Sequence, residues 1–270
     1  MHYLPGELSH HLALKGLKIL HLTGLLELFI SKKDLNSHLT DKDITNLTGK
    51  IGIAAGLDKN GDYIDCLAAL GVDFIEVGTI TPRPQIGNPK PRIFRNLKDR
   101  SLVNRLGFNN KGVDYLVKKL KNKKTNVIVG TSIGKNFDPP NESALEDYLH
   151  CIEEVYEYSD YIAINISSPN TKGLRQLSHE ENFNSFLLEI KRMQNQLSTN
   201  NKYVPIFIKI SPDELFEDLS IICSSILGSK LDGIICSNTT VDHDHKNGPG
   251  GLSGAPLKDK TTECLVNVRR

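Results

Sequence analysis

The chain has 270 residues, which is enough for one large domain or two small ones with a buried core. A net charge of +1 provides no bulk field that would attract nucleic acid, and the absence of Trp with few other aromatic residues argues against a base-stacking surface. No two of the five cysteines form a CxxC pair, and several lie in apolar periodic stretches. We therefore expect reduced, buried thiols, with neither a metal site nor a disulfide framework.

The N-terminal segment, residues 1–40, differs in character from the rest of the chain. Apolar residues recur over residues 7–30, but lysines, His21 and Glu27 interrupt them, so no transmembrane span is predicted. The segment lacks the cleavage site of a signal peptide, and Gly24 is expected to divide it into two short helices. Such an amphipathic pair suits a membrane interface. A helical cap packed on the main domain is supported by the pattern at least as well.

Residues 48–270 show a regular alternation of short β-rich runs with helical stretches. Strands are predicted at residues 51–57, 74–79, 127–133, 161–167, 206–211 and 233–239. Helices are predicted at residues 63–70, 112–121, 144–156, 182–197 and 213–227. Because the strand runs are apolar on both faces and separated by helices, they predict a parallel sheet in an α/β domain. The glycine-rich residues 248–254 predict a flexible loop.

Polar side chains gather at the C-terminal end of each predicted strand, where a β/α barrel builds its active site. The most informative group is the run Asn165-Ile166-Ser167-Ser168-Pro169-Asn170-Thr171. Asparagine amides recognise both the donors and the acceptors of a polar ring, and a serine can move a proton if the pocket excludes water. Taken alone, the run favours a loop stabilised by turn hydrogen bonds. Its neighbours elsewhere in the chain favour a site.

Two lysines, Lys59 and Lys209, lie at the end of one predicted strand and inside another. A single lysine at such a position is more often a solvated charge. A buried ammonium needs an anionic partner, or its pKa falls. Two such lysines therefore favour an anionic ligand or an electron-rich cofactor ring at this edge of the sheet.

Seven segments together carry a specific family pattern: residues 54–60, 78–85, 104–110, 165–171, 209–212, 237–240 and 250–254. Over roughly residues 49–262 the chain resembles the dihydroorotate dehydrogenases, and it is most similar to their quinone-linked, membrane-associated class. Ser168 stands where the soluble class has a cysteine base, and residues 7–13 resemble the membrane-docking helices of the quinone-linked class. The resemblance implies a TIM (β/α)8-type barrel with a small N-terminal helical segment, residues 1–40, that docks on the membrane.

The activity implied by this resemblance is oxidation of dihydroorotate to orotate in de novo pyrimidine (UMP) biosynthesis, with FMN as the flavin and a membrane quinone as the electron acceptor. The protein would be a peripheral membrane protein, on the inner face of a bacterial cell membrane or on the inner mitochondrial membrane. Ser168 would take a proton from C5 of the substrate while a hydride leaves C6 for flavin N5. Thr171 and Phe108 match positions that shape the proton relay.

The resemblance also assigns binding roles, and Lys59 is placed between substrate and flavin. The implied FMN contacts are Ala55, Gly56, Leu57, Asp58, Lys59, Thr79, Ser132, Asn165, Lys209 and Ser237. The implied substrate contacts are Lys59, Asn104, Arg105, Leu106, Gly107, Phe108, Asn165, Asn170, Asn238 and Thr239. His10 and Arg95 match positions beside the quinone tunnel. Two positions depart from the family pattern: Ser132 replaces an expected asparagine, and His11 replaces a common arginine.

Six barrel strands are predicted, so the sequence is expected to lack the last two βα units and the glycine-rich segment that holds the flavin phosphate in such barrels. We expect the chain as printed to retain FMN poorly. Two alternatives stay open at this point. One is a catalytically inactive, truncated remnant of the enzyme, and the other is a different flavin barrel that acts on a reduced pyrimidine.

Overall fold

The computed structural model describes residues 4–30, 50–138, 144–170, 174–179, 182–244, 246 and 248–269. Helix α1 (Gly6–Leu22) opens the described chain and is followed by a short 3₁₀ helix, η1 (Leu25–Leu28). Gly24 separates the two in the left-handed region, with φ 72°, which confirms the predicted break. Residues 31–40 of the predicted N-terminal segment lie outside the described residues. Within the described ranges, we find no helix that combines the length and the apolar character needed to cross a bilayer.

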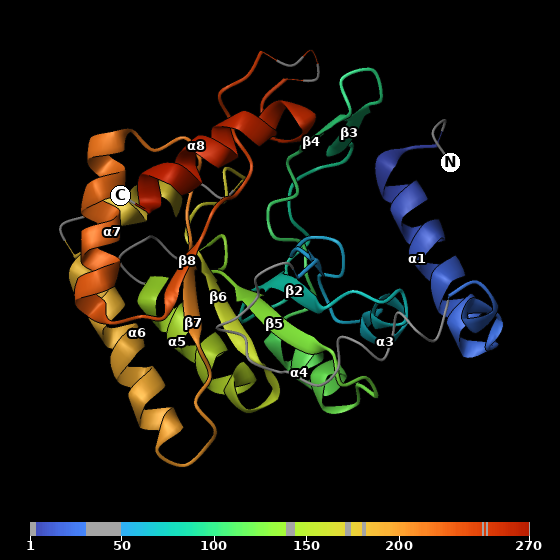
Figure 1. Ribbon diagram of the computed structural model, residues 1–270, viewed down its shortest axis with the longest axis horizontal. Helices are drawn as coiled ribbons and strands as arrows, with labels where there is room; N and C mark the ends of the chain where they lie inside the picture. The colour runs from blue at the N-terminus through green and yellow to red at the C-terminus, as the bar shows by residue number, and fades with distance from the viewer. Residues whose placement is uncertain are drawn as a thin grey trace.

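The main sheet of the described chain contains six parallel strands in the spatial order β1-β2-β5-β6-β7-β8 (Figure 1). The strands are β1 (Gly52–Ile53), β2 (Phe74–Ile80), β5 (Ile128–Ile133), β6 (Tyr161–Asn165), β7 (Ile206–Lys209) and β8 (Gly233–Ile235). Each coincides with one of the six predicted strands. Because the strands are parallel, every connection returns to the same end of the sheet. Because their spatial order follows the chain order, each strand lies beside the one before it, as in a β/α barrel.

Helices follow the strands and cover one side of the sheet, so that the chain has a TIM-like α/β fold. The connecting helices are α3 (Ile64–Ala68), α4 (Val113–Lys121), α5 (Ala144–Val155), α6 (Phe183–Ser198) and α7 (Phe216–Ser229). Short 3₁₀ turns supplement them: η3 (Tyr156–Tyr158), η4 (Leu174–His179) and η5 (Ala255–Leu257). In Figure 1, α4 to α7 lie on the outer side of the strands.

Side chains alternate between the two faces of the main sheet and form one apolar layer on each face. On β2, Ile75 and Val77 are fully buried in the main core against the helices. On the opposite face of the same strand, Phe74 packs in a smaller cluster with Tyr161 and Ala163 of β6. Successive side chains of a strand point to opposite faces, so one face packs on the helices and the other fills the barrel interior.

A second, antiparallel sheet was missed by the sequence analysis. It has the order β3-β4-β9, with β3 (Ile93–Asn96), β4 (Ser101–Asn104) and β9 (Gly251–Gly254). The prediction of a flexible loop over residues 248–254 is therefore wrong for β9, whose residues pair with β4. A Cβ at Gly251 would lie 2.0 Å from Thr239 Oγ1, so glycine is required there by close packing.

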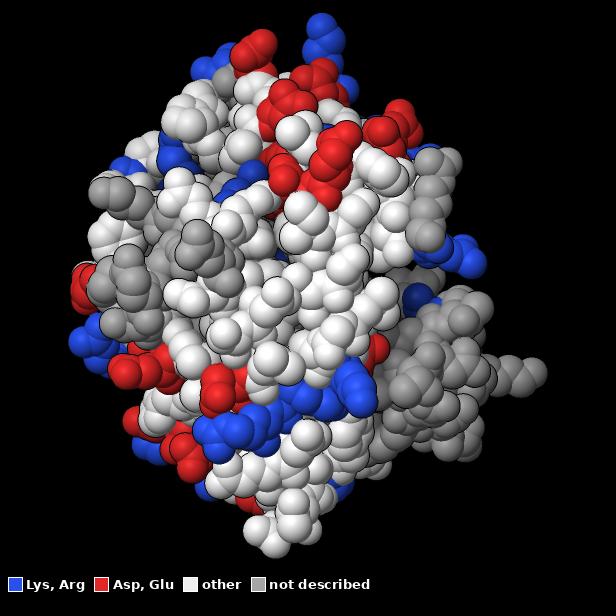
Figure 2. Space-filling view, turned by 90° about the vertical axis from the view of Figure 1, so that its left-hand side faces the viewer, with Lys and Arg blue, Asp and Glu red and all other residues white. Residues whose placement is uncertain are grey.

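Helix α8 (Lys258–Val268) follows β9 and η5 and packs beside α7 near the C-terminus (Figure 1). Figure 2 shows this side of the molecule, where a broad area of uncharged side chains separates acidic residues from a row of lysines and arginines. Exposed apolar residues on α7 include Phe216, Ile221 and Leu227, which are 50, 63 and 77% exposed. On α8, Leu265 and Val266 are also exposed.

Candidate active site

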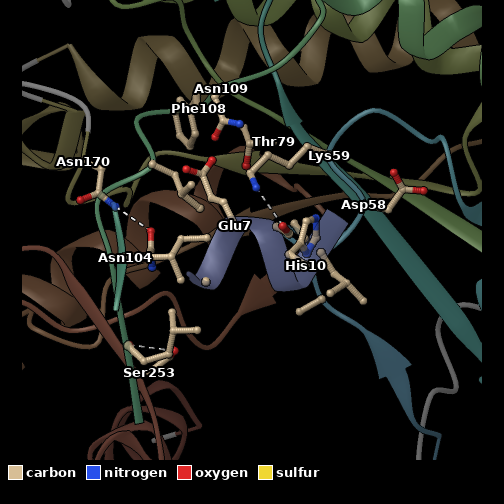
Figure 3. Close-up of a pocket in the computed structure, with 18 of the residues that line it drawn as sticks. Glu7, His10, Asp58, Lys59, Thr79, Asn104, Phe108, Asn109, Asn170 and Ser253 are labelled. Atoms are coloured by element: carbon tan, nitrogen blue, oxygen red, sulfur yellow. Dashed lines mark hydrogen bonds between the residues drawn. The ribbon is translucent and has the colours of Figure 1, made fainter. Parts of the chain in front are cut away.

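A cavity of about 1170 Å³ lies at the C-terminal ends of the parallel strands. The loops after the strands form its base, α1 forms one wall, and residues of β3, β4 and β9 form another. In Figure 3, Glu7 and His10 project from α1 toward Lys59, while Asn104 and Asn170 lie on the far side. The cavity thus joins the N-terminal helix to loops that are far apart in sequence.

Most of the residues assigned by the family resemblance line this one cavity. They are His10, Ala55, Gly56, Leu57, Asp58, Lys59, Thr79, Arg95, Asn104, Leu106, Gly107, Phe108, Asn165, Ser168, Asn170, Lys209, Ser237, Asn238 and Thr239. Their placement on one surface makes the predicted assignments geometrically compatible. The roles themselves stay predictions.

Four asparagines of the cavity, which we call the amide cluster, form two hydrogen-bonded pairs. Asn170 Nδ2 donates to Asn104 Oδ1 at 3.0 Å, and Asn238 Nδ2 donates to Asn165 Oδ1 at 3.2 Å. Asn238 Nδ2 also donates to Ser167 Oγ at 3.1 Å. Each amide keeps further donor or acceptor capacity. The cluster can therefore bind a ring that carries alternating N–H and C=O groups.

Ser168 lies beside this cluster and is only 6% exposed. Its hydroxyl oxygen accepts the backbone N–H of Asn170 at 3.3 Å. Phe108, which is also buried, lines the same cavity in a left-handed conformation, with φ 51°. A buried hydroxyl is shielded from bulk water, which suits proton transfer to a positioned serine.

Lys59 enters the cavity from the loop after β1, and its ammonium donates to the carbonyl of Gly56 at 3.0 Å. Desolvation, followed by repulsion from Arg92, lowers the pKa of Lys59 to about 8. Desolvation and repulsion from Lys59 lower the pKa of His10 to about 4. At neutral pH the cavity therefore presents a lysine cation beside an uncharged imidazole.

Lys209 reaches the cavity from β7 and forms an ion pair with Glu76 of β2, Nζ to Oε1 3.5 Å. The two side chains are only 11 and 5% exposed. Tyr161 donates its hydroxyl to Glu76 Oε2 at 3.1 Å, whereas Oε1 has no hydrogen-bond partner among the described residues. A buried carboxylate thus offsets the charge of Lys209 from inside the barrel, as the anionic partner that a buried ammonium needs.

Thr79 connects the flavin-assigned residues of neighbouring strands. Its hydroxyl accepts Asn165 Nδ2 at 2.9 Å and lies 2.8 Å from the hydroxyl of Ser132. Ser132 is fully buried and does not line the cavity, so it lies behind Thr79. Its predicted contact with the flavin stays a prediction, and its hydrogen-bonded neighbour Thr79 is the residue of the two that lines the cavity.

Three other predicted residues differ from these in their placement. Asp58 lines the cavity, but its carboxylate accepts the backbone N–H groups of Asp62 and Tyr63 at 2.9 and 2.7 Å, before α3. Arg105 does not line the cavity, because its guanidinium stacks on Phe94 and donates to the carbonyl of Pro249. Thr171 lies outside the described residues.

Several cavity residues were not assigned from the sequence, including Glu7, Asn109 and Ser253. Glu7 Oε1 accepts two hydrogen bonds from buried Arg92, Nε at 3.1 Å and Nη2 at 2.9 Å, and this pair ties α1 to the barrel. Asn109 Oδ1 is buried and has no hydrogen-bond partner among the described residues. Only the position of Asn109 inside the motif of residues 104–110 could have indicated it.

Arg95, assigned to the quinone tunnel, lies on β3 and contacts α1. Its Nη2 donates to the carbonyl of Leu4 and to Ser9 Oγ, the latter at 3.3 Å. His10, its predicted partner, projects from the same helix into the cavity (Figure 3). The two residues therefore line the cavity where α1 and β3 meet, and their role beside a quinone tunnel stays a prediction.

Comparison with known proteins identifies the family. The family model for dihydroorotate dehydrogenase matches residues 36–270. "Dihydroorotate dehydrogenase (quinone)" of Acinetobacter baylyi is 46% identical over 97% of this chain and 79% of its own length. The protein of the same name from Vibrio parahaemolyticus is 46% identical over 97% of this chain and 80% of its own length.

Solved structures agree with the sequence matches. DHODH from Eimeria tenella in complex with ferulenol is 33% identical, with a TM-score of 0.82 over 97% of this chain and 76% of that chain. The ligand-free form from the same organism is 32% identical, with a TM-score of 0.78 over 95% and 78% of the two chains. The chain therefore belongs to the dihydroorotate dehydrogenase family, within the class whose curated members are named dihydroorotate dehydrogenase (quinone).

Proposed function

We propose that this protein oxidises dihydroorotate to orotate in de novo pyrimidine synthesis, using FMN and a membrane quinone as electron acceptor. The observation that carries this proposal is the cavity that Ser168, the amide cluster, Lys59 and Lys209 all line. Dihydroorotate offers ring amides to the asparagines and a carboxylate to a cation. The names of the similar curated proteins support quinone as the acceptor.

The residues that line the cavity fit the ring and ribityl parts of FMN. The cavity of about 1170 Å³ exceeds the range of roughly 300–1,000 Å³ typical of single-ligand pockets, so it has room for a flavin with a second small molecule. Lys59, Lys209 and Thr79 bring cationic and hydroxyl donors to it. The unpartnered oxygen of Asn109 offers an acceptor for a ring N–H. When bound, FMN supplies a hydride acceptor for C6 of the substrate.

The roles of the chain's own residues follow from this arrangement. Asn104, Asn170 and Asn238 hold the ring amides of dihydroorotate, and Lys59 attracts its carboxylate. Ser168 Oγ takes the proton from C5, and Phe108 excludes water around that step. Departure of the C5 proton and the C6 hydride leaves the C5=C6 double bond of orotate. Thr171 would pass the proton on, as the family resemblance implies.

Lys59 gives this binding step a pH dependence. We expect orotate affinity to fall as pH rises through about 8, because above that pH Lys59 loses the charge that attracts the carboxylate. Calorimetric titration of orotate on either side of pH 8 measures this dependence. The Lys59→Met variant should bind orotate weakly at both pH values. An affinity that does not change with pH in the unsubstituted protein would remove Lys59 from carboxylate binding.

We further propose that α1 and η1 lie in the membrane interface and that quinone enters between α1 and the barrel, beside His10 and Arg95. The exposed apolar residues of this segment support the proposal: Leu8, Leu12, Ile19, Leu20, Leu22, Leu25, Leu28 and Phe29. Peripheral attachment through such a face scales with its apolar area and with attraction between basic residues and anionic lipids. The localisation would be the membrane that holds the quinone.

Replacing the three most exposed of these residues tests the attachment. The triple variant Leu22→Gln, Leu28→Gln and Phe29→Ser should lose most flotation with vesicles of anionic phospholipid, because it removes the apolar face while leaving buried Leu14 in place. A matched control replaces exposed apolar residues of α7, Ile221→Gln and Leu227→Gln, and should float like the unsubstituted protein. Equal flotation of both variants would support a packing cap instead.

For the barrel, we propose that the six parallel strands correspond to the first six of an eight-stranded TIM barrel. Strands β1 and β8 stand at the two ends of the sheet order, so neither has a second neighbour in the main sheet among the described residues. The exposed apolar residues of α7 and α8 are the kind of surface that further βα units cover. Two such units between β8 and β1 would close the barrel.

The acceptor assay tests the proposed function. Protein supplied with excess FMN should reduce a short-chain ubiquinone analogue when dihydroorotate is added, and should do so much faster than it reduces NAD or fumarate. The amount of orotate formed, measured by absorbance, should equal the amount of quinone consumed, measured by chromatography. Turnover with NAD or fumarate but not with quinone would overturn the quinone assignment, and no orotate with any acceptor would overturn the reaction.

A further inference from the structure

Arg175 makes three contacts that join the loops around the proposed base. It lies in η4, and its Nε donates to the carbonyl of Ser167 at 3.1 Å. Its Nη2 donates to the carbonyl of Thr239 at 2.9 Å, and its Nη1 donates to Asp213 Oδ2 at 2.7 Å. One planar guanidinium therefore connects the loops that follow β6, β7 and β8.

Asp213 is the anionic partner in this arrangement and has several other donors. Lys260 of α8 forms an ion pair with Oδ1 at 2.7 Å, and the backbone N–H of Val241 donates to Oδ2 at 2.8 Å. The hydroxyl of Thr240 donates to Oδ1 as well. Burial alone would raise the pKa of Asp213, but these hydrogen bonds hold it at about 2, so the carboxylate stays ionised.

The contacts of Arg175 act on the active-site loop without touching the cavity. Neither Arg175 nor Asp213 lines it. The Ser167 carbonyl belongs to the peptide group whose nitrogen is that of Ser168, and the Ser167 hydroxyl donates to the carbonyl of Lys209 at 2.7 Å. Thr239 follows Asn238 of the amide cluster. Through these two carbonyls, the guanidinium joins the backbone of the Ser168 loop to that of the Asn238–Thr239 loop.

We propose that Arg175 and Asp213 form a positioning pair for dihydroorotate oxidation, which holds the Ser168 loop in register with the Asn238–Thr239 loop. The proposal rests on the proposed function for the role of Ser168. The pair aligns the base with the bound ring, and misplacement of a catalytic group by about 1 Å can cost about 100-fold in rate. Loss of Arg175 should therefore reduce the rate of the chemical step more than it weakens substrate binding.

The kinetic test compares Arg175→Ala with Arg192→Ala, which removes an exposed arginine whose partner is Glu189 on the same helix, α6. In protein supplied with FMN, Arg175→Ala should bleach the flavin with dihydroorotate about 100-fold more slowly at saturating substrate. Its orotate affinity should change several-fold at most. Guanidinium ion at millimolar concentration should restore part of the rate, because it can occupy the vacated site. Arg192→Ala should behave like the unsubstituted protein.

A second measurement needs neither flavin nor turnover. In hydrogen exchange followed by mass spectrometry, Arg175→Ala should exchange faster than Arg192→Ala at residues 165–170 and 237–241, with equal exchange in α5. Asp213→Asn should show the same pattern, which covers the case in which Arg175→Ala folds poorly. The proposal would be overturned if Arg175→Ala and Asp213→Asn both bleached the flavin and exchanged hydrogen at the same rates as Arg192→Ala. If the unsubstituted protein never reduces flavin, the proposed function fails and exchange alone decides for or against the positioning pair.

Discussion

Replacing Ser168 with alanine should nearly abolish flavin bleaching by dihydroorotate while FMN remains bound. Positioned general bases typically contribute about 10²–10⁴-fold, and we expect a loss in that range. The reason is geometric: Ser168 is buried, lines the cavity and accepts a hydrogen bond from the backbone of Asn170 in the amide cluster. Rapid mixing of FMN-supplied protein with dihydroorotate under anaerobic conditions measures the bleaching rate.

Two comparisons make the Ser168 result specific. Ser168→Cys should retain more activity than Ser168→Ala, because a thiolate is a competent base, and its rate should increase with pH. Ser220→Ala removes an exposed hydroxyl on α7 that donates to the carbonyl of Phe216 and should leave the rate unchanged. Near-normal bleaching in Ser168→Ala would remove Ser168 from the role of base.

Breaking the Glu76–Lys209 ion pair should lower the free energy of unfolding more than any other substitution proposed for this protein. Lys209→Met leaves the Glu76 carboxylate buried without its cation, and removal of one partner of a buried pair costs about 3–5 kcal/mol of unfolding free energy. Tyr161 would still donate to the carboxylate, but Oε1, which has no hydrogen-bond partner among the described residues, would lose the ammonium beside it. Urea unfolding followed by circular dichroism measures the change.

The double variant Glu76→Gln with Lys209→Met separates the lost pair from a general packing defect. Removing both charges should recover most of the stability that Lys209→Met loses, because no uncompensated charge stays buried. Lys202→Met, which breaks the exposed pair with Asp160, should change the unfolding free energy by less than about 1 kcal/mol. A double variant no more stable than Lys209→Met would mean that packing, not charge, explains the loss.

The parallel sheet could be predicted because its signal is local. Each strand is a short apolar run, and buried parallel strands need apolar residues on both faces, as Ile162 to Ile164 of β6 illustrate. The antiparallel sheet could not, since Gly251–Gly254 has the composition of a loop. Its strand conformation depends on pairing with β4, about 150 residues earlier in the chain, and local propensity gives no sign of such a partner.

The candidate site was predictable to a similar extent. Strand-end motifs indicated Asn165, Asn170, Asn238 and both lysines, whereas Asn104 and the role of Ser168 as base were implied only by the family resemblance. The resemblance indicated His10 of α1, but the Glu7–Arg92 contact was not predictable, since it joins residues 85 positions apart. The contacts of Arg175 were not predicted for the same reason, because its partners Asp213 and Thr239 come from two later loops.

A single-turnover experiment tests the central claim most directly. Dihydroorotate is mixed anaerobically with this protein and a known amount of bound FMN, with no other acceptor, and the products are quenched and separated. We expect one orotate for each flavin bleached, and reappearance of the flavin spectrum when a quinone is added. Bleaching without orotate, or unchanged flavin in the presence of bound dihydroorotate, would contradict the proposal that this cavity oxidises dihydroorotate.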